Sequence, residues 1–126
     1  MAKSNSSKKI LIVEDDADQI MIYQTAFKNA GYSVLTASSC EEARKVIEKE
    51  SPDLVLLDLL LEKDNGISIL KRMKEKGCPP NTKIVIFTNF FKKNLAEECK
   101  RLGAKDFISK MDFVPSEIVK RVADCL

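Results

Sequence analysis

The sequence contains no histidine and no tryptophan among its 126 residues. Without histidine, the chain cannot build a Ser-His-Asp triad, use an imidazole as a general base or bind a metal through imidazole. It also cannot carry a phosphohistidine of its own. These classes of site are therefore excluded.

The sequence also lacks any pair of closely spaced cysteines, since its four are Cys40, Cys78, Cys99 and Cys125. A Cys/His zinc site cannot be assembled from them. We interpret them as reduced thiols of an intracellular protein. The polar start, MAKSNSSKK, is no signal peptide, and the longest nearly apolar run, residues 54–61, is too short for a membrane helix. We therefore expect a soluble cytoplasmic protein with no membrane partner.

An excess of charge is missing as well, because the formal net charge is +2. So small a charge, with lysines scattered along the chain, does not favour direct binding of nucleic acid. Apolar residues make up 44% of the chain, enough for a buried core in one domain. We expect a flexible polar tail over residues 1–8 and a single domain over residues 9–126.

Short apolar segments alternate with segments of helical period along that domain. The predicted strands are residues 9–13, 32–37, 53–58, 83–88 and 106–109. The first predicted helix carries apolar positions at Ala17, Ile20, Tyr23, Phe27 and Ala30, and the second follows the capping residue Ser39. The third covers residues 67–76, the fourth includes Leu95 to Leu102, and the fifth begins near Pro115. Five strands that are each followed by a helix predict an α/β fold with a doubly wound parallel sheet.

Polar residues occur where the predicted strands end: Glu14, Asp15, Asp58, Thr88 and Lys110. Right-handed crossovers bring all these strand ends to one edge of the sheet, where ligands of such folds bind. Two carboxylates about 4 Å apart repel by about 4 kcal/mol at an effective dielectric of 20, so such a cluster loses stability unless a cation balances it or some of the carboxylates are protonated. Carboxylates with open water positions suit Mg²⁺. Acids, a metal, a lysine and a hydroxyl together are typical of a phosphoryl-transfer site.

Simpler interpretations exist for some of these residues. Asp16 fits a helix cap better than a ligand, and Asp58 could be a turn residue, although its apolar flanks make an unpaired charge costly there. A nucleotide- or flavin-binding protein is disfavoured because the loop EDDADQ after the first strand has no G-x-G-x-x-G pattern. A haloacid-type phosphatase would need a second Asp where Leu60 stands.

The chain resembles the response-regulator receiver family over residues 9 to about 124. The matching motifs are ILIVEDD (10–16), LVLLDLLL (54–61) with Gly66 eight residues after Asp58, IVIFT (84–88) and GAKDFISK (103–110). The resemblance implies a flavodoxin-like five-stranded sheet of order 2-1-3-4-5 with five helices on both faces. It also implies a single-domain response regulator of a two-component phosphorelay.

By the same resemblance, Asp58 looks like the phospho-acceptor. The implied Mg²⁺ ligands are Asp15, Asp58 and the backbone carbonyl of Leu60, with Glu14 acting through a water. Thr88 and Lys110 are expected to contact the phosphoryl oxygens. Phe107 occupies the aromatic position that, in the family, changes together with Thr88 on activation.

The implied phosphodonor is a sensor histidine kinase or a histidine phosphotransfer protein, and an unknown downstream protein is expected to bind the face of the fourth helix, fifth strand and fifth helix. The chain is expected to be a monomer or weak dimer that hydrolyses its own acyl phosphate slowly. Leu60 and Phe90, bulky and apolar at two variable positions, favour a long-lived phosphorylated state. Met111 stands where the family usually has proline, and Asn89 where it has a small residue. These departures keep open an alternative, a degenerate receiver that binds partners without phosphorylation.

Overall fold

The computed structural model describes residues 8–61, 66–76, 82–89 and 92–126. Strands and helices alternate along them: β1 (Lys9–Val13), α1 (Ala17–Asn29), β2 (Ser33–Ala37), α2 (Cys40–Glu50), β3 (Leu54–Leu57), α3 (Ile67–Lys76), β4 (Lys83–Thr88), α4 (Lys93–Arg101), β5 (Asp106–Ser109) and α5 (Pro115–Cys125). A 3-10 turn, η2 (Lys110–Asp112), lies between β5 and α5 and was not predicted. The predicted strand–helix alternation is confirmed.

The strands form one parallel sheet of order β2-β1-β3-β4-β5. The predicted order is therefore confirmed, and β1 and β3 are neighbours in the middle of the sheet. Their register pairs Val13 with Leu57, so both strands end at the same level. Every residue of β3 is buried, as expected for a central strand covered by helices on both faces.

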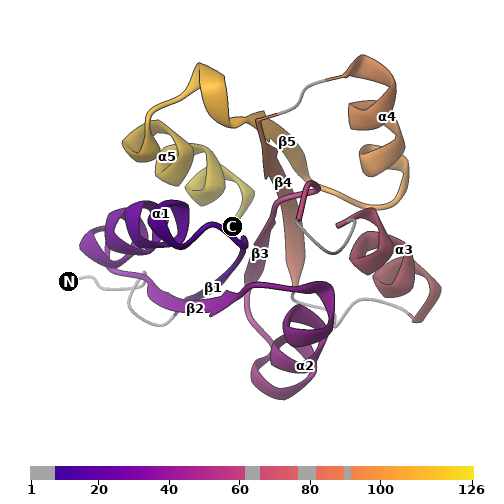
Figure 1. The fold of residues 1–126 in the computed structure, drawn as a ribbon, viewed down its shortest axis with the longest axis horizontal. Coiled ribbons are helices and arrows are strands. Elements are labelled where there is room, and N and C mark those ends of the chain that lie inside the picture. Colours follow the sequence, from indigo (N-terminus) through magenta and orange to yellow (C-terminus); the bar gives the residue numbers. More distant parts are fainter. Residues whose placement is uncertain (1–7, 62–65, 77–81, 90–91) are drawn as a thin grey trace.

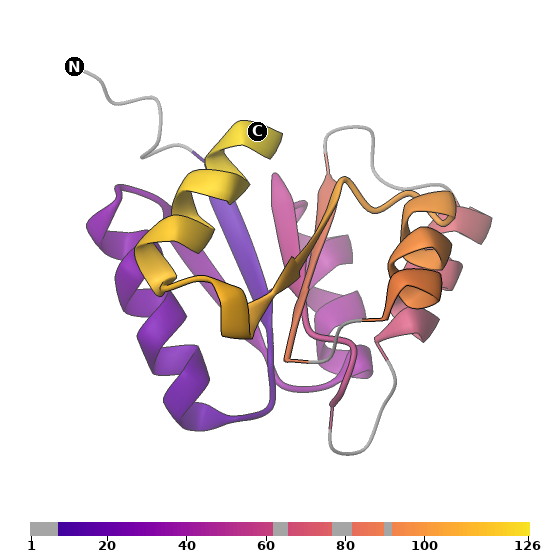
Figure 2. The same cartoon turned by 90° about the horizontal axis from the view of Figure 1, so that it is seen from above.

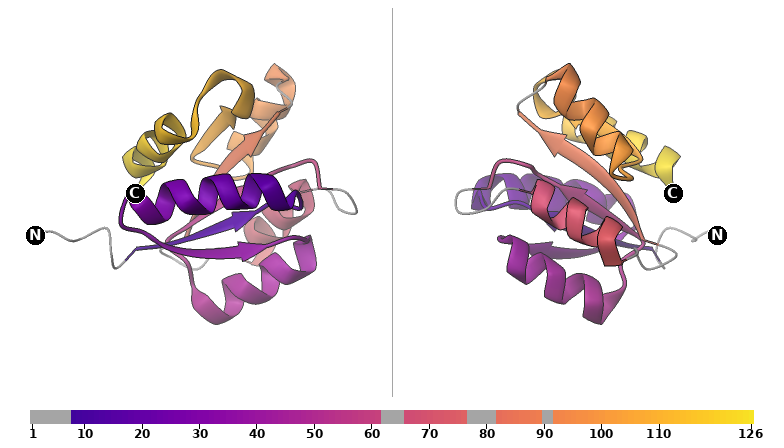
Figure 3. Two further views of the ribbon diagram at one scale, coloured as in Figure 1. Left: turned by 60° about the vertical axis from the view of Figure 1, so that its left-hand side comes forward. Right: turned by 90° about the vertical axis from the view of Figure 1, so that its right-hand side faces the viewer.

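Two hydrophobic clusters lie on opposite faces of the sheet, because alternate residues of a strand point to opposite sides. The first joins the sheet to α2, α3 and α4, and the second joins it to α1 and α5. Figures 1 and 2 show α1 and α5 together on one side of the strands and α3 and α4 on the other. The two views of Figure 3 show α1 lying along β1 and β2, and α2, α3 and α4 side by side.

The predicted helix ends agree with local chemistry. The Asp16 carboxylate accepts the N–H groups of Asp18 and Gln19 at 2.9 and 3.3 Å and caps α1, which confirms the capping role expected for it. Gly31 follows α1 with a φ of 98°, a conformation that residues with a Cβ rarely adopt. Ala17, expected on the inner side of α1, is instead exposed, because the first turn of the helix lies beyond the edge of the core.

Some boundaries of the elements differ from the predicted ones. The second strand begins at Ser33 rather than residue 32, and Lys8, the last residue of the predicted tail, accepts a backbone hydrogen bond from Ser33. The other tail residues, Gly77, Cys78, Phe90 and Phe91 lie outside the described residues. None of the helices that the structure describes has the length and apolar character to span a bilayer.

Candidate functional site

The sheet register places Glu14 and Asp58 side by side at the carboxyl edge. Each is the first residue after its strand, and the Asp58 N–H donates to the Val13 carbonyl at 3.1 Å. The Glu14 N–H donates to the carbonyl of Ala37 in β2 at 3.0 Å. Both carboxylates are buried, with residue exposures of 1% for Glu14 and 6% for Asp58. Two acids this deep in the protein need a positive partner.

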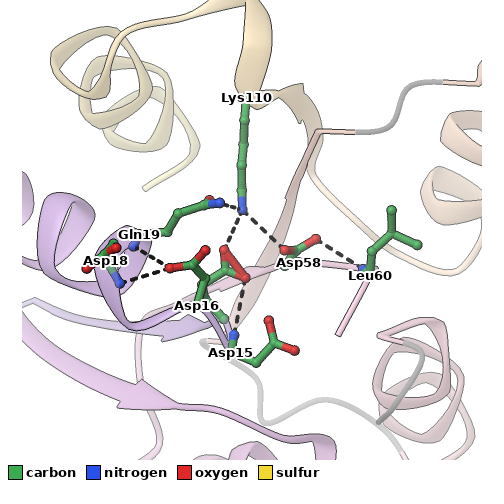
Figure 4. Close-up of polar contacts among 8 residues, drawn as sticks. Asp15, Asp16, Asp18, Gln19, Asp58, Leu60 and Lys110 are labelled. Atoms are coloured by element: carbon green, nitrogen blue, oxygen red, sulfur yellow. Dashed lines mark hydrogen bonds and ion pairs between the residues drawn. The ribbon is translucent and has the colours of Figure 1, made fainter. Parts of the chain in front are cut away.

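Lys110 supplies that partner from the start of η2. Its ammonium donates to Glu14 Oε1 at 2.7 Å and to Asp58 Oδ2 at 3.2 Å (Figure 4). It also donates to Gln19 Oε1 at 2.7 Å, so its three N–H groups have three oxygen acceptors. Lys110 is itself buried. Residues separated by 96 and 52 positions in the sequence thus form one network.

Two aromatic rings form the floor of this network. The Lys110 Nζ lies 4.3 Å from the centre of the Phe87 ring in β4, within the range of a cation–π contact. Tyr23 of α1 packs edge-to-face on Phe87, with ring centres 5.1 Å apart. The apolar floor limits the motion of the lysine side chain and excludes water from below it.

Asp15 and Leu60 lie at the rim of the site. The Asp15 N–H donates to Glu14 Oε2 at 3.2 Å, and its half-buried carboxylate projects separately from the groups around Lys110 Nζ (Figure 4). The Leu60 N–H donates to Asp58 Oδ1 at 3.1 Å, while the Leu60 side chain is exposed. One Asp58 oxygen therefore receives a backbone donor and the other receives the ammonium.

Thr88 and Phe107 belong to the opposite face of the sheet. Thr88 ends β4, is fully buried and pairs in register with Ser109, the residue before Lys110. By strand alternation it shares a face with Ile86, whose register partner is Phe107. Phe107 is buried in the cluster that contains α4 residue Cys99. Thr88 and Phe107 are thus close neighbours beneath α4, and Lys110 lies on the α1 side.

The glycine at position 66 of the motif has a structural reason. Its N–H donates to the Leu59 carbonyl at 3.0 Å. A Cβ on Gly66 would lie 2.5 Å from the Asp58 carbonyl oxygen and 3.0 Å from the Leu59 Cα, and both contacts are with backbone atoms. Because backbone cannot swing aside as a flexible side chain can, only glycine allows this approach to Asp58.

The electrostatics of the site centre on Glu14. Burial, together with hydrogen bonding to Asp58, raises the pKa of Glu14 to about 7, although Lys110 works in the opposite direction. Burial also raises the pKa of Tyr23, and the charges of Glu14 and Asp58 add to that rise. The ammonium of Lys110 therefore does not fully offset the burial of Glu14 beside a second carboxylate.

The donor chemistry at this edge fits a hard divalent cation. The oxygen donors expected from the sequence are the carboxylates of Asp15 and Asp58 and the backbone carbonyl of Leu60, and these are of the type that Mg²⁺ prefers. In the part of the chain that the structure describes, no three Asp, Glu, Cys or His side chains are gathered closely enough to hold a metal ion. In the arrangement seen, Lys110 is the cation between Glu14 and Asp58.

Sequence reasoning named Glu14, Asp58 and Lys110, which the structure brings together, but it missed Gln19 and the aromatic floor. Gln19 lies one helical turn before Tyr23, so it continues the inner side of α1 toward the sheet edge. A polar residue at the end of such an apolar stripe is the signal that could have found it.

Comparison with known proteins gives three kinds of match. The family model described as "Response regulator receiver domain" matches residues 10–123. The alkaline phosphatase synthesis transcriptional regulatory protein PhoP of Bacillus subtilis is 38% identical over 117 residues, which cover 92% of this chain and 47% of that protein. The chain spans about half the length of this and other curated relatives that it matches.

In two further matches, the aligned region covers most of both chains. The chemotaxis protein CheY of Thermotoga maritima is 34% identical over 116 residues, with coverage of 90% of this chain and 92% of that protein. The solved CheX-CheY-BeF3-Mg+2 complex from Borrelia burgdorferi contains a chain with a TM-score of 0.85 at 26% identity, covering 94% of this chain and 88% of that one.

Proposed function

Because the chain belongs to the response regulator receiver domain family of two-component signalling, we propose that it accepts a phosphoryl group on Asp58. The donor is a phosphohistidine of a sensor kinase or a histidine phosphotransfer protein. The phosphorylated form then selects a downstream protein. The role is that of a signalling switch with slow self-hydrolysis rather than that of a turnover enzyme on small substrates.

The observation that carries this proposal is the position of Lys110. Its ammonium lies 3.2 Å from Asp58 Oδ2 at the carboxyl edge of the sheet, where ligands of doubly wound folds bind. A phosphoryl group on Asp58 brings additional negative oxygens to this place. A buried ammonium already held there stabilises that charge without having to reorganise.

The transfer itself is a displacement at phosphorus. A carboxylate oxygen of Asp58 forms the new O–P bond as the N–P bond of the phosphohistidine breaks. The electron pair of that bond stays on the imidazole nitrogen of the donor protein, which takes a proton from solvent. The product is an aspartyl phosphate, a mixed anhydride that water hydrolyses later.

The residues of the site divide this work. Lys110 attracts the phosphoryl oxygens, and the Leu60 N–H orients the Asp58 carboxylate through Oδ1. The carboxylates of Asp15 and Asp58 and the Leu60 carbonyl are the groups that would hold Mg²⁺, with Glu14 adding negative charge beside them. When bound, the metal ion neutralises charge on the carboxylates and the phosphoryl oxygens.

Thr88 is the proposed link to the rest of the molecule. Its hydroxyl contacts a phosphoryl oxygen, and a shift of Thr88 changes the packing of its neighbour Phe107 under α4. This biases the face formed by α4, β5 and α5 between two arrangements, and the partner binds one of them.

Incubation with acetyl phosphate, with and without Mg²⁺, followed by intact-mass measurement tests the proposal. The expected result is addition of one phosphoryl group that depends on Mg²⁺ and is lost in Asp58→Asn. Asp53→Asn is the matched control, because Asp53 stands at the opposite end of β3 and accepts the N–H of Lys9. It should take up the group as the parent does.

The absence of any adduct in the parent chain, under all these conditions, would overturn the proposal. That result would favour the alternative in which the domain binds its partners without phosphorylation. An adduct that persists in Asp58→Asn would instead place the acceptor on another residue.

A further inference from the structure

Among the residues that the structure describes, Gln19 is the one uncharged acceptor on the Lys110 ammonium. The amide Oε1 lies 2.7 Å from Nζ, as close as Glu14 Oε1 and closer than Asp58 Oδ2 at 3.2 Å. Both shorter bonds hold the ammonium from the β1–α1 side of the site. The longer one leaves the least strongly bound N–H directed at Asp58.

Several contacts hold Gln19 in this position. Its own N–H is bound by the Asp16 carboxylate that caps α1, so the backbone of the first turn is fixed. One turn further along, Tyr23 packs against Phe87, the ring beneath Lys110. Figure 4 shows the Gln19 side chain extending from α1 to the ammonium. The glutamine thus approaches Lys110 from a part of the molecule that neither Asp58 nor a phosphoryl group on it occupies.

The chemical type of this side chain also matters. An apolar residue here would leave one N–H of a buried ammonium without an acceptor, which is costly. A carboxylate would add a third acid to the two that already share Lys110, and it would compete with Asp58 for the charge. A neutral amide oxygen satisfies the donor and leaves the charge balance of the site unchanged.

We propose that Gln19 is a positioning residue that holds Lys110 beside Asp58 for phosphoryl transfer, an inference that rests on the function proposed above. It touches neither the phosphoryl donor nor Asp58 and acts through Lys110 alone. Its amide holds one N–H of the ammonium, so the remaining N–H beside Asp58 already faces the incoming phosphoryl oxygen. Removing the amide oxygen lets the flexible lysine side chain sample other positions.

Two measurements on the same variants test the inference. The first is the ¹H–¹⁵N NMR signal of the Lys110 ammonium, which needs no phosphorylation. The signal is expected in the parent and in Gln24→Met, the matched control in the other glutamine of α1. It should be lost or strongly shifted in Gln19→Met, which removes the acceptor at similar size. It should be present in Gln19→Glu, which keeps an acceptor at the same length.

The second measurement is the rate constant of phosphorylation by acetyl phosphate in Mg²⁺. We expect Gln19→Met to lower it about tenfold, which corresponds to one lost hydrogen bond to a charged group. Gln24→Met should leave it unchanged. In a Lys110→Met background, Gln19→Met should cause no further loss, because the residue acts only through the lysine.

An unchanged Lys110 signal in Gln19→Met would overturn the inference, as would a tenfold loss that persists in the Lys110→Met background. If the parent takes up no phosphoryl group, the proposed function fails, and the role of Gln19 in transfer fails with it. The NMR signal would still report whether Gln19 holds the lysine, so the two failures are distinguishable.

Discussion

The raised pKa of Glu14 predicts a specific loss of stability between mildly acidic and neutral pH. The carboxyl group titrates at about 7 in the folded protein and near 4.5 when it is free. Between these values the folded state retains a proton that the unfolded state has lost. The free energy of unfolding therefore falls as pH rises through this window, since stability rises with pH only where the unfolded state binds more protons.

The size of the effect follows from the shift. The difference between about 7 and 4.5 is about 2.5 pH units, and each unit corresponds to about 1.4 kcal/mol. Glu14 therefore costs the folded state about 3 kcal/mol once the pH is above 7, and nothing well below 4.5. This cost is a sizeable part of the 5–15 kcal/mol that typically stabilises a domain.

Urea unfolding of the parent and of Glu14→Gln, followed by far-UV circular dichroism at pH 5 and pH 8 without divalent cations, measures this cost. Glutamine keeps an acceptor for Lys110 but cannot ionise. The stability of Glu14→Gln relative to the parent should increase by about 2–3 kcal/mol from pH 5 to pH 8. Glu97→Gln, on the exposed side of α4, is the control and should show no such change.

A stability difference between parent and Glu14→Gln that stays constant from pH 5 to pH 8 would refute the reasoning. It would mean that Lys110 compensates the burial of Glu14 completely. The charged form of the carboxylate would then be no less stable inside the protein than in water.

Three further predictions concern the same edge of the sheet. Gly66→Ala should displace the Asp58 backbone, which should lower the free energy of unfolding by about 1–3 kcal/mol and slow phosphorylation by acetyl phosphate. An unchanged free energy in urea unfolding and an unchanged rate by intact mass would contradict the close contact between position 66 and the Asp58 carbonyl. Mg²⁺ should raise the thermal unfolding temperature of the parent, measured by circular dichroism, and should raise that of Asp15→Asn much less. Equal rises in the two proteins would place the ion elsewhere. The exposed side chain of Leu60 should help to shield the acyl phosphate from water. The parent should therefore keep its phosphoryl group for minutes or longer in Mg²⁺ buffer, and Leu60→Asn should lose it faster. Loss from the parent within seconds would refute this.

Much of the fold follows from local patterns in the sequence. The apolar run at residues 54–57 favours a central strand covered on both faces, as the structure has it, and the signals at Asp16, Ser39 and Pro115 mark helix starts correctly. The turn η2 was missed because its three residues carry no periodic pattern. Ala17 was placed inside because apolar spacing alone does not say where the core ends.

The site was only partly predictable for a different reason. The alternation of strands and helices brings all strand ends to one edge, which is why Glu14, Asp58 and Lys110 could be associated without coordinates. Which carboxylate the lysine contacts depends on side-chain directions that spacing does not encode. Gln19 escaped notice because a glutamine near a helix start has no chemistry of its own until a lysine 91 positions away meets it.

Successive residues at the end of β4 point to opposite faces of the sheet, and this affects how many partner proteins can respond to one modification of the site. Lys110 lies over the ring of Phe87 on the side of α1 and α5, whereas Thr88 ends the same strand on the side of α4. If a phosphoryl group on Asp58 contacts both side chains, as proposed above, it is in touch with both layers of helices. Two different proteins docking on opposite sides of the domain could then each respond to the same chemical event, without either having to reach the modified residue.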